Sequence, residues 1–158
     1  MKAKISRGGG ARGMLNYALD QGPKRSGDKQ AEIVGGNMAG SQARELAKEF
    51  GVTRALRPEC SRPVWHCSLS LPQGEAMPPE KWDQVTRAFM EKMELDPDNH
   101  QFVVARHQDT KFDHAHIVAS RIGLDGELWH GKWEARKAIK ATQELEREMG
   151  LVITPGLE

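Results

Sequence analysis

The segment from His107 to Val118 constrains this chain more than any other; it reads His-Gln-Asp-Thr-Lys-Phe-Asp-His-Ala-His-Ile-Val. It holds three of the six histidines within ten residues and then becomes apolar. His114 and His116 are two positions apart, so on a β-strand both point to one face of the sheet. With His107 arriving from the loop before them, three imidazoles predict a metal site. The alternative is a polar loop whose histidines only pair with nearby carboxylates.

A second stretch, Val64 to Leu71, predicts the clearest β-strand, because apolar and polar residues alternate along it. The apolar set is Trp65, Cys67, Leu69 and Leu71, and the polar set is His66, Ser68 and Ser70. We expect the apolar face to belong to the core. The polar face is then either exposed to solvent or one wall of a site.

The remaining periodicities predict an α+β fold with a largely antiparallel sheet. Asp125-Gly126 is a strong hairpin signal. We expect helices to cover one face of the sheet, and the other face to carry the active site with His66, His107, His114 and His116. The expected strands are residues 1–6, 31–34, 64–71, 102–106, 117–124 and 127–130, and the expected helices are residues 14–20, 44–50, 78–93 and 133–149. Ser41 is expected to cap the second helix, and Gly51 to end it.

The 158 residues fit one domain with a proper core, and the net charge is only +1. No apolar run is long enough to span a bilayer and the N-terminus carries no hydrophobic signal segment, so we expect a cytoplasmic protein that does not use a membrane. Cys60 and Cys67 indicate neither a disulfide framework nor a zinc finger.

Positive charge is concentrated near the N-terminus. The basic residues up to position 25 are Lys2, Lys4, Arg7, Arg12, Lys24 and Arg25, against the single acid Asp20. This asymmetry, with the glycines between Arg7 and Gly13, suits an anionic partner such as a phosphate chain. A solvated loop without a partner is the alternative.

Tyr17 is the only tyrosine, and it lies off the apolar stripe formed by Leu15, Ala18 and Leu19. A divalent metal held by three imidazoles keeps open positions for a substrate oxygen. If that oxygen belongs to a phosphodiester, a tyrosine could attack the phosphorus, although its pKa of about 10 means that a base or a nearby cation must help. Without the histidines, Tyr17 would be interpreted as a packing residue.

Taken together, these residues resemble the motifs of the conjugative relaxases, the plasmid mobilisation nucleases of the HUH endonuclease superfamily, and most of all the MOBP type. The resemblance covers nearly the whole chain. It rests on His107-x-Asp109 with His114-x-His116-Ile117-Val118, on Asn16-Tyr17 after a Gly/Arg segment, on Gly35-Gly36-Asn37-Met38, and on Trp65-His66-Cys67-Ser68-Leu69-Ser70. It implies that residues 1–158 are a DNA-nicking domain, either complete or the N-terminal part of a longer bacterial protein.

The resemblance also implies a role for each residue. Tyr17 would attack the scissile phosphate at a nick site in single-stranded DNA, leaving a 5′-phosphotyrosine and a free 3′-OH. His107, His114 and His116 would hold the metal, and Asp109 would orient a histidine. His66 is a candidate for proton transfer or substrate positioning, with a hydrogen-bonded wall residue as the alternative. The expected DNA contacts are Arg7, Arg12, Lys24, Arg25 and Asn37.

Cofactor and partners follow from the same resemblance. Mg²⁺ or Mn²⁺ would serve the DNA chemistry, although three imidazoles also suit Zn²⁺ or Ni²⁺. The substrate would be single-stranded DNA at a transfer origin, with accessory relaxosome proteins. The rival interpretations are a rolling-circle initiator or transposase, a structural metal or nucleic-acid-binding module, and a water-using phosphoesterase. A tyrosine that precedes the histidines favours the relaxase over the first pair.

Overall fold

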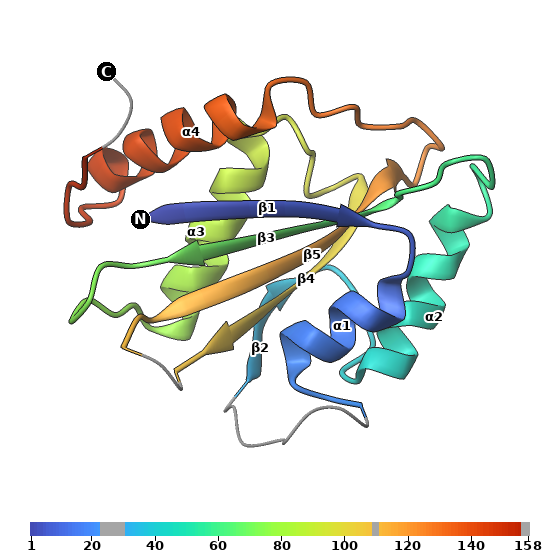
Figure 1. Ribbon diagram of the computed structural model, residues 1–158, viewed down its shortest axis with the longest axis horizontal. Helices are drawn as coiled ribbons and strands as arrows, with labels where there is room; N and C mark the ends of the chain where they lie inside the picture. The colour runs from blue at the N-terminus through green and yellow to red at the C-terminus, as the bar shows by residue number, and fades with distance from the viewer. Residues whose placement is uncertain (23–30, 109–110, 156–158) are drawn as a thin grey trace.

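A computed structural model describes residues 1–22, 31–108 and 111–155, and within these ranges the chain forms one antiparallel sheet and four helices (Figure 1). The strands are β1 (Lys2–Gly8), β2 (Glu32–Gly36), β3 (Val64–Ser70), β4 (His100–His107) and β5 (His114–Gly123), in the spatial order β1-β3-β5-β4-β2. The helices are α1 (Ala11–Leu19), α2 (Ala43–Arg54), α3 (Pro79–Lys92) and α4 (Glu134–Glu148). None of these helices is both long enough and apolar enough to cross a membrane.

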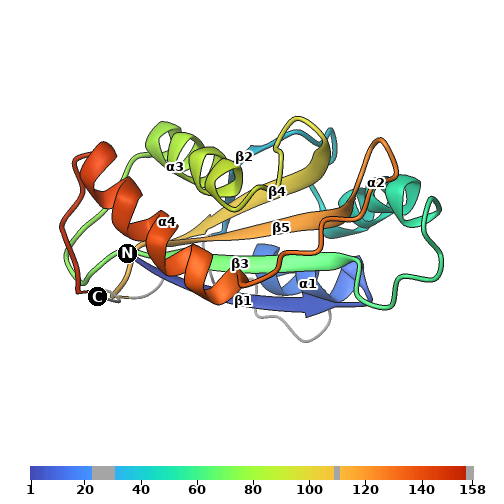
Figure 2. The ribbon, with the colours of Figure 1, turned by 90° about the horizontal axis from the view of Figure 1, so that it is seen from above.

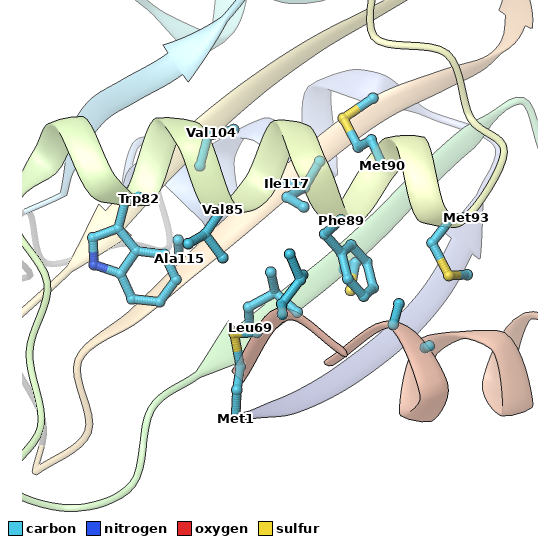
Figure 3. Packing of buried hydrophobic residues seen from close by; sticks show 14 of the residues in the cluster. Met1, Leu69, Trp82, Val85, Phe89, Met90, Met93, Val104, Ala115 and Ile117 are labelled. Atoms are coloured by element: carbon cyan, nitrogen blue, oxygen red, sulfur yellow. The ribbon is translucent and has the colours of Figure 1, made fainter. Parts of the chain in front are cut away.

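The larger core lies between one face of the sheet and the helices α3 and α4. The alternation along β3 and β5 sends Trp65, Cys67 and Ile117 to this face, where each is fully buried. Figure 3 shows Trp82, Val85 and Phe89 of α3 pointing onto the strands. Each large apolar side chain buried in this way contributes about 1.5–3 kcal/mol, which makes this layer the main source of stability.

A second core on the opposite face corrects the expectation that helices cover only one face of the sheet. Leu15 of α1 and Phe50 of α2 pack there on Val103 and Val118 of the sheet. Figure 2 shows α1 and α3 on opposite sides of the sheet. The predicted α+β class and antiparallel sheet are confirmed, but the helices cover both faces, because the polar alternation does not extend to these valines and their apolar surface needs its own cover.

Three local predictions were also wrong. The residue that caps the second helix is Gln42 and not Ser41. The expected strand 127–130 is reduced to one bridge between Ile122 and Leu128. The second helix does not stop at Gly51 but continues to Arg54. Its extra turn is held against the sheet by the buried hydroxyl of Thr53, which lies 2.6 Å from Gln101 Oε1 and 3.0 Å from Ser120 Oγ. These contacts outweigh the tendency of a glycine to end a helix.

The edge strand β1 is anchored through its first residue. The ammonium group of Met1 lies 2.6 Å from Glu146 Oε2 of α4, and the two side chains are 0% and 1% exposed. The hydroxyl of Thr154 donates to the same carboxylate at 2.6 Å. Figure 3 shows Met1 beside Leu69 of the core. This buried ion pair ties β1 to the end of α4.

We expect Glu146→Gln to lower the free energy of unfolding by about 3 kcal/mol at pH 7, because it leaves a buried ammonium without its countercharge. Urea unfolding measures this. Glu148→Gln is the control, since the Glu148 side chain is 56% exposed and pairs with Lys92 at the surface, where a salt bridge contributes about 0–1 kcal/mol. An equal decrease in the two variants would contradict the prediction.

The difference in unfolding free energy between the wild type and Glu146→Gln should depend on pH. Burial raises the pKa of Glu146, but the hydrogen bonds from the ammonium group and from Thr154 lower it, and the resulting pKa lies below the usual glutamate value. A carboxyl group with such a pKa stabilises the fold above its unfolded pKa of about 4.3, and this stabilisation disappears as the pH falls. The difference between wild type and Glu146→Gln therefore shrinks below about pH 4.

Candidate active site

Three histidines meet where β4 ends and β5 begins. His107 is the last residue of β4 and pairs with His114, the first residue of β5, while His116 pairs with Ala105. One ligand atom from each imidazole lies within 4.8 Å of the other two. The convergence is as predicted, except that His107 belongs to a strand and not to the preceding loop. His107 and His116 are buried, and His114 is half-buried.

Each ring is oriented by a hydrogen bond at one of its nitrogens. His114 Nδ1 lies 2.9 Å from the carbonyl oxygen of Phe112. His116 Nδ1 lies 2.8 Å from His66 Nε2, and His107 Nε2 bonds to the carbonyl oxygen of Ala18. Metal coordination would use the second nitrogen of each ring, which is the usual arrangement of metal-binding histidines. The three residues therefore fit a divalent metal ion.

His66 lies on β3 beside the triad. Its Nε2 faces His116, and its Nδ1 lies 3.4 Å from the hydroxyl of Ser6 on β1. Burial lowers the pKa of His66 to about 4, so the ring is neutral at pH 7. A neutral imidazole has one donor and one acceptor, which allows it to accept from His116 while donating to Ser6. This geometry allows His66 to orient the ring of His116, and its expected role in proton transfer or substrate positioning remains a prediction.

Tyr17 of α1 stands against the same histidines. Its ring makes edge contacts with His116 and His66, at centroid distances of 5.4 and 5.9 Å. The side chain is 42% exposed and lines a cavity of about 410 Å³ together with both histidines. The bond from His107 to the carbonyl of Ala18 ties the last turn of α1 to the triad. The chain therefore brings the phenol and the imidazoles of the triad into one site.

Two predicted DNA contacts lie elsewhere. Arg7 points to the α4 face of the sheet, where its Nη2 lies 2.8 Å from both Glu134 Oε2 and the carbonyl of His130. Asn37 follows β2 and connects it to the start of β4, because its side-chain amide donates to the carbonyls of Pro97 and His100 at 2.9 and 2.8 Å. Both side chains make contacts within the fold, and their expected DNA contacts remain predictions.

The other predicted residues divide in two groups. Arg12 is exposed in the first turn of α1 and lines a cavity of about 260 Å³ with Arg54. Lys24, Arg25 and Asp109 lie outside the described residues, so their expected roles remain predictions.

Several residues that line the site were not among the predicted site residues. The Tyr17 cavity is also lined by Lys4, Ser6 and Ser68. A neighbouring cavity of about 730 Å³ shares Lys4 and Ser68 and adds Lys2, Ser70 and Phe112. The alternation in β1 and β3 was a signal that these polar residues share a face. Only the register of β1 and β3 shows which of these residues are neighbours, because it pairs Lys4 with Ser68 and Ser6 with His66.

Comparison with known proteins gives one finding. Residues 17–151 match the model of a protein family described as "Relaxase: MobA/VirD2-like, nuclease domain". The matched range includes Tyr17, His66 and the three histidines of the triad. No curated protein and no solved structure matches the chain.

We expect His114→Ala to weaken the binding of Mn²⁺ or Co²⁺ by more than about 100-fold, because it removes a direct ligand. His114 is half-buried, so the unfolding free energy of the metal-free protein should change by less than about 1 kcal/mol. Titration calorimetry and thermal unfolding measure the two effects. His130→Ala, at an exposed histidine before α4, is the control and should bind metal like the wild type. Undiminished binding by His114→Ala would remove it from the ligand set.

Proposed function

Because the chain belongs to the relaxase family, as a nuclease domain of the MobA/VirD2-like type, we propose that it nicks and rejoins one DNA strand at a plasmid origin of transfer. The reaction starts conjugative transfer or mobilisation in the bacterial cytoplasm. The observation that carries the proposal is the position of Tyr17, whose ring lies 5.4 Å from that of His116 in the histidine triad. A structural metal site has no need of a half-exposed phenol at its side.

In the proposed reaction, the Oη atom of Tyr17 attacks the scissile phosphorus and the bond from phosphorus to the 3′ oxygen breaks. The phenol gives up one proton and the leaving 3′ oxygen takes one up, so a phosphodiester is exchanged and none is hydrolysed. The 3′-OH can therefore attack the phosphotyrosine and rejoin the strand. A divalent ion held by the three imidazoles would supply positive charge that offsets the charge developing on the phosphate oxygens.

The chain's own residues prepare this attack. His107 holds α1 through the carbonyl of Ala18, which keeps Tyr17 beside the triad. His66 orients His116 through its Nε2 atom. As to the ion, three imidazoles suit Mn²⁺, Zn²⁺ or Ni²⁺ better than Mg²⁺ by ligand type; we propose that Mg²⁺ or Mn²⁺ works in the reaction and that Zn²⁺ or Ni²⁺ can occupy the same ligands.

The surface beside the site supports single-stranded DNA as the substrate. Lys2 and Lys4 of β1 are exposed, and neither takes part in an ion pair within the described residues. Lys4 and Ser68 line both of the two adjoining cavities, Lys2 lines the second, and no carboxylate of the described chain lines either. Phe112, which is 43% exposed, lies at the second cavity. We call the two adjoining cavities the groove. Its lysines can pair with the phosphates of a single DNA strand, and its aromatic ring can stack on a base.

Contacts outside this groove complete the proposal. Arg12, exposed at the start of α1, remains a proposed phosphate contact, as do Lys24 and Arg25. The net charge of +1 gives this domain little general attraction to DNA. We therefore propose that accessory proteins of the relaxosome help to load it onto the transfer origin.

The central prediction concerns Tyr17→Phe, which keeps the ring and removes only the hydroxyl. Wild type, incubated with Mn²⁺ and an oligonucleotide from the transfer origin, should form a covalent protein–DNA adduct that survives denaturing electrophoresis. The variant should form none, while binding Mn²⁺ like the wild type. Cleavage that persists in Tyr17→Phe would indicate a water nucleophile. Metal binding without any cleavage by the wild type would indicate a structural metal site.

A second prediction concerns the groove. Lys2→Gln/Lys4→Gln should reduce the slope of log affinity against log salt concentration by about 0.7 for each DNA phosphate that the variant no longer neutralises. Fluorescence anisotropy with a single-stranded oligonucleotide measures this slope over a NaCl series. Lys140→Gln is the control for removing a lysine charge, because Lys140 is 80% exposed on α4 across the sheet. Equal slopes in the double variant and the wild type would place the DNA elsewhere.

A further inference from the structure

A buried ion pair lies directly behind two of the metal-binding histidines. Arg106 precedes His107 at the end of β4, and Asp113 precedes His114 at the start of β5. These strand ends lie side by side (Figure 1). Because successive strand residues point to opposite faces, Arg106 extends away from the site while His107 extends into it. Six residues, 108–113, connect the two histidines along the chain.

Arg106 and Asp113 form a bidentate ion pair, which we call the clamp. Arg106 Nε lies 3.0 Å from Asp113 Oδ1, and Arg106 Nη2 lies 3.1 Å from Oδ2. The side chains are only 7% and 6% exposed. Two parallel hydrogen bonds between a planar guanidinium and a planar carboxylate fix both the separation and the relative orientation of their backbones.

Asp113 is also fixed from other directions. Its Oδ2 accepts a hydrogen bond from the backbone N–H of Met77 at 2.9 Å and from Trp82 Nε1 of α3 at 3.1 Å. Its backbone carbonyl accepts from Leu71 N, just beyond β3, at 3.0 Å. The residue before His114 is thus tied to β4, to α3 and to the end of β3.

Stability alone does not account for an ion pair at this place. Replacing a buried ion pair by well-packed apolar side chains is often neutral or stabilising. Apolar packing, however, is not directional, whereas the clamp defines one arrangement. The site needs a defined arrangement here, because the rings of His107 and His114 must stay near their centroid distance of 5.1 Å although a six-residue connection separates them.

We propose that Arg106 and Asp113 are positioning residues for the metal centre: their clamp keeps His107 and His114 in the arrangement that binds the ion. The inference rests on the proposed function, since it assumes that the triad binds a metal. It adds a role for two residues that touch neither the ion nor the substrate.

The experiment measures metal affinity separately from stability. Asp113→Asn, in the full chain, is titrated with Mn²⁺ by calorimetry and with Co²⁺ by visible absorption. We expect affinities about 10–100-fold weaker than in the wild type and a changed Co²⁺ spectrum. Glu146→Gln is the matched control: it also breaks a buried ion pair, but one between Met1 and α4, and it should keep the wild-type affinity and spectrum.

A second variant covers the case in which Asp113→Asn does not fold. Arg106→Met/Asp113→Asn leaves no buried charge unpaired and keeps an amide oxygen that can accept from Met77 N and Trp82 Nε1, so it should keep the fold and yet bind both ions more weakly. Unchanged affinity and spectrum in the folded variants would overturn the clamp and leave the metal centre intact. A wild type that binds neither ion would overturn the proposed metal centre, and the clamp with it.

Discussion

The antiparallel pairing of β4 with β5 is the constraint on which the site depends. It places His107 opposite His114 and brings His116 alongside, so three imidazoles converge on one face of the sheet. A shift of one residue in this register would turn the side chains of one strand to the opposite face. The register is protected on that face by the packing of Ile117 and Val104 in the larger core and by the ion pair between Arg106 and Asp113.

The two faces of the sheet perform different tasks. One is covered by α3 and α4 and supplies the main core. The other is divided: α1 and α2 cover its apolar part, while the polar part near β1 and β3 carries Lys4, Ser68 and His66 around a cavity. The site lies at the boundary, where a packed helix presents Tyr17 to the imidazoles and a cavity lies beside them. This division explains how a small domain combines a rigid scaffold with an open binding surface.

Hydrogen bonds, more than apolar packing, define the site itself. His107 Nε2 forms a hydrogen bond with the carbonyl oxygen of Ala18, and His116 Nδ1 forms one with His66 Nε2. Apolar contacts would tolerate small displacements of these rings, whereas a hydrogen bond between buried groups is costly to break and has a preferred direction. The helix of Tyr17 and the strands of the histidine triad are therefore positioned relative to each other through the same imidazoles that would bind the ion.

The sequence by itself determined the local features. The two-residue spacing of His114 and His116 predicted that they share a face, and the alternation in residues 64–71 predicted which side of β3 is buried; both are confirmed. The same kind of alternation places Arg7 with Ala3 and Ile5 on the α4 side of β1. Period and spacing are encoded by neighbours in the chain, so they can be inferred without coordinates.

Only the tertiary structure decided which distant segments meet. It placed Ala18 against His107, Ser6 against His66 and Arg106 against Asp113. It also covered both faces of the sheet with helices and extended α2 past Gly51. These outcomes depend on how separate apolar surfaces are buried together and on which buried polar groups find partners. That choice is made by the whole folded chain, because no short stretch contains both halves of such a contact.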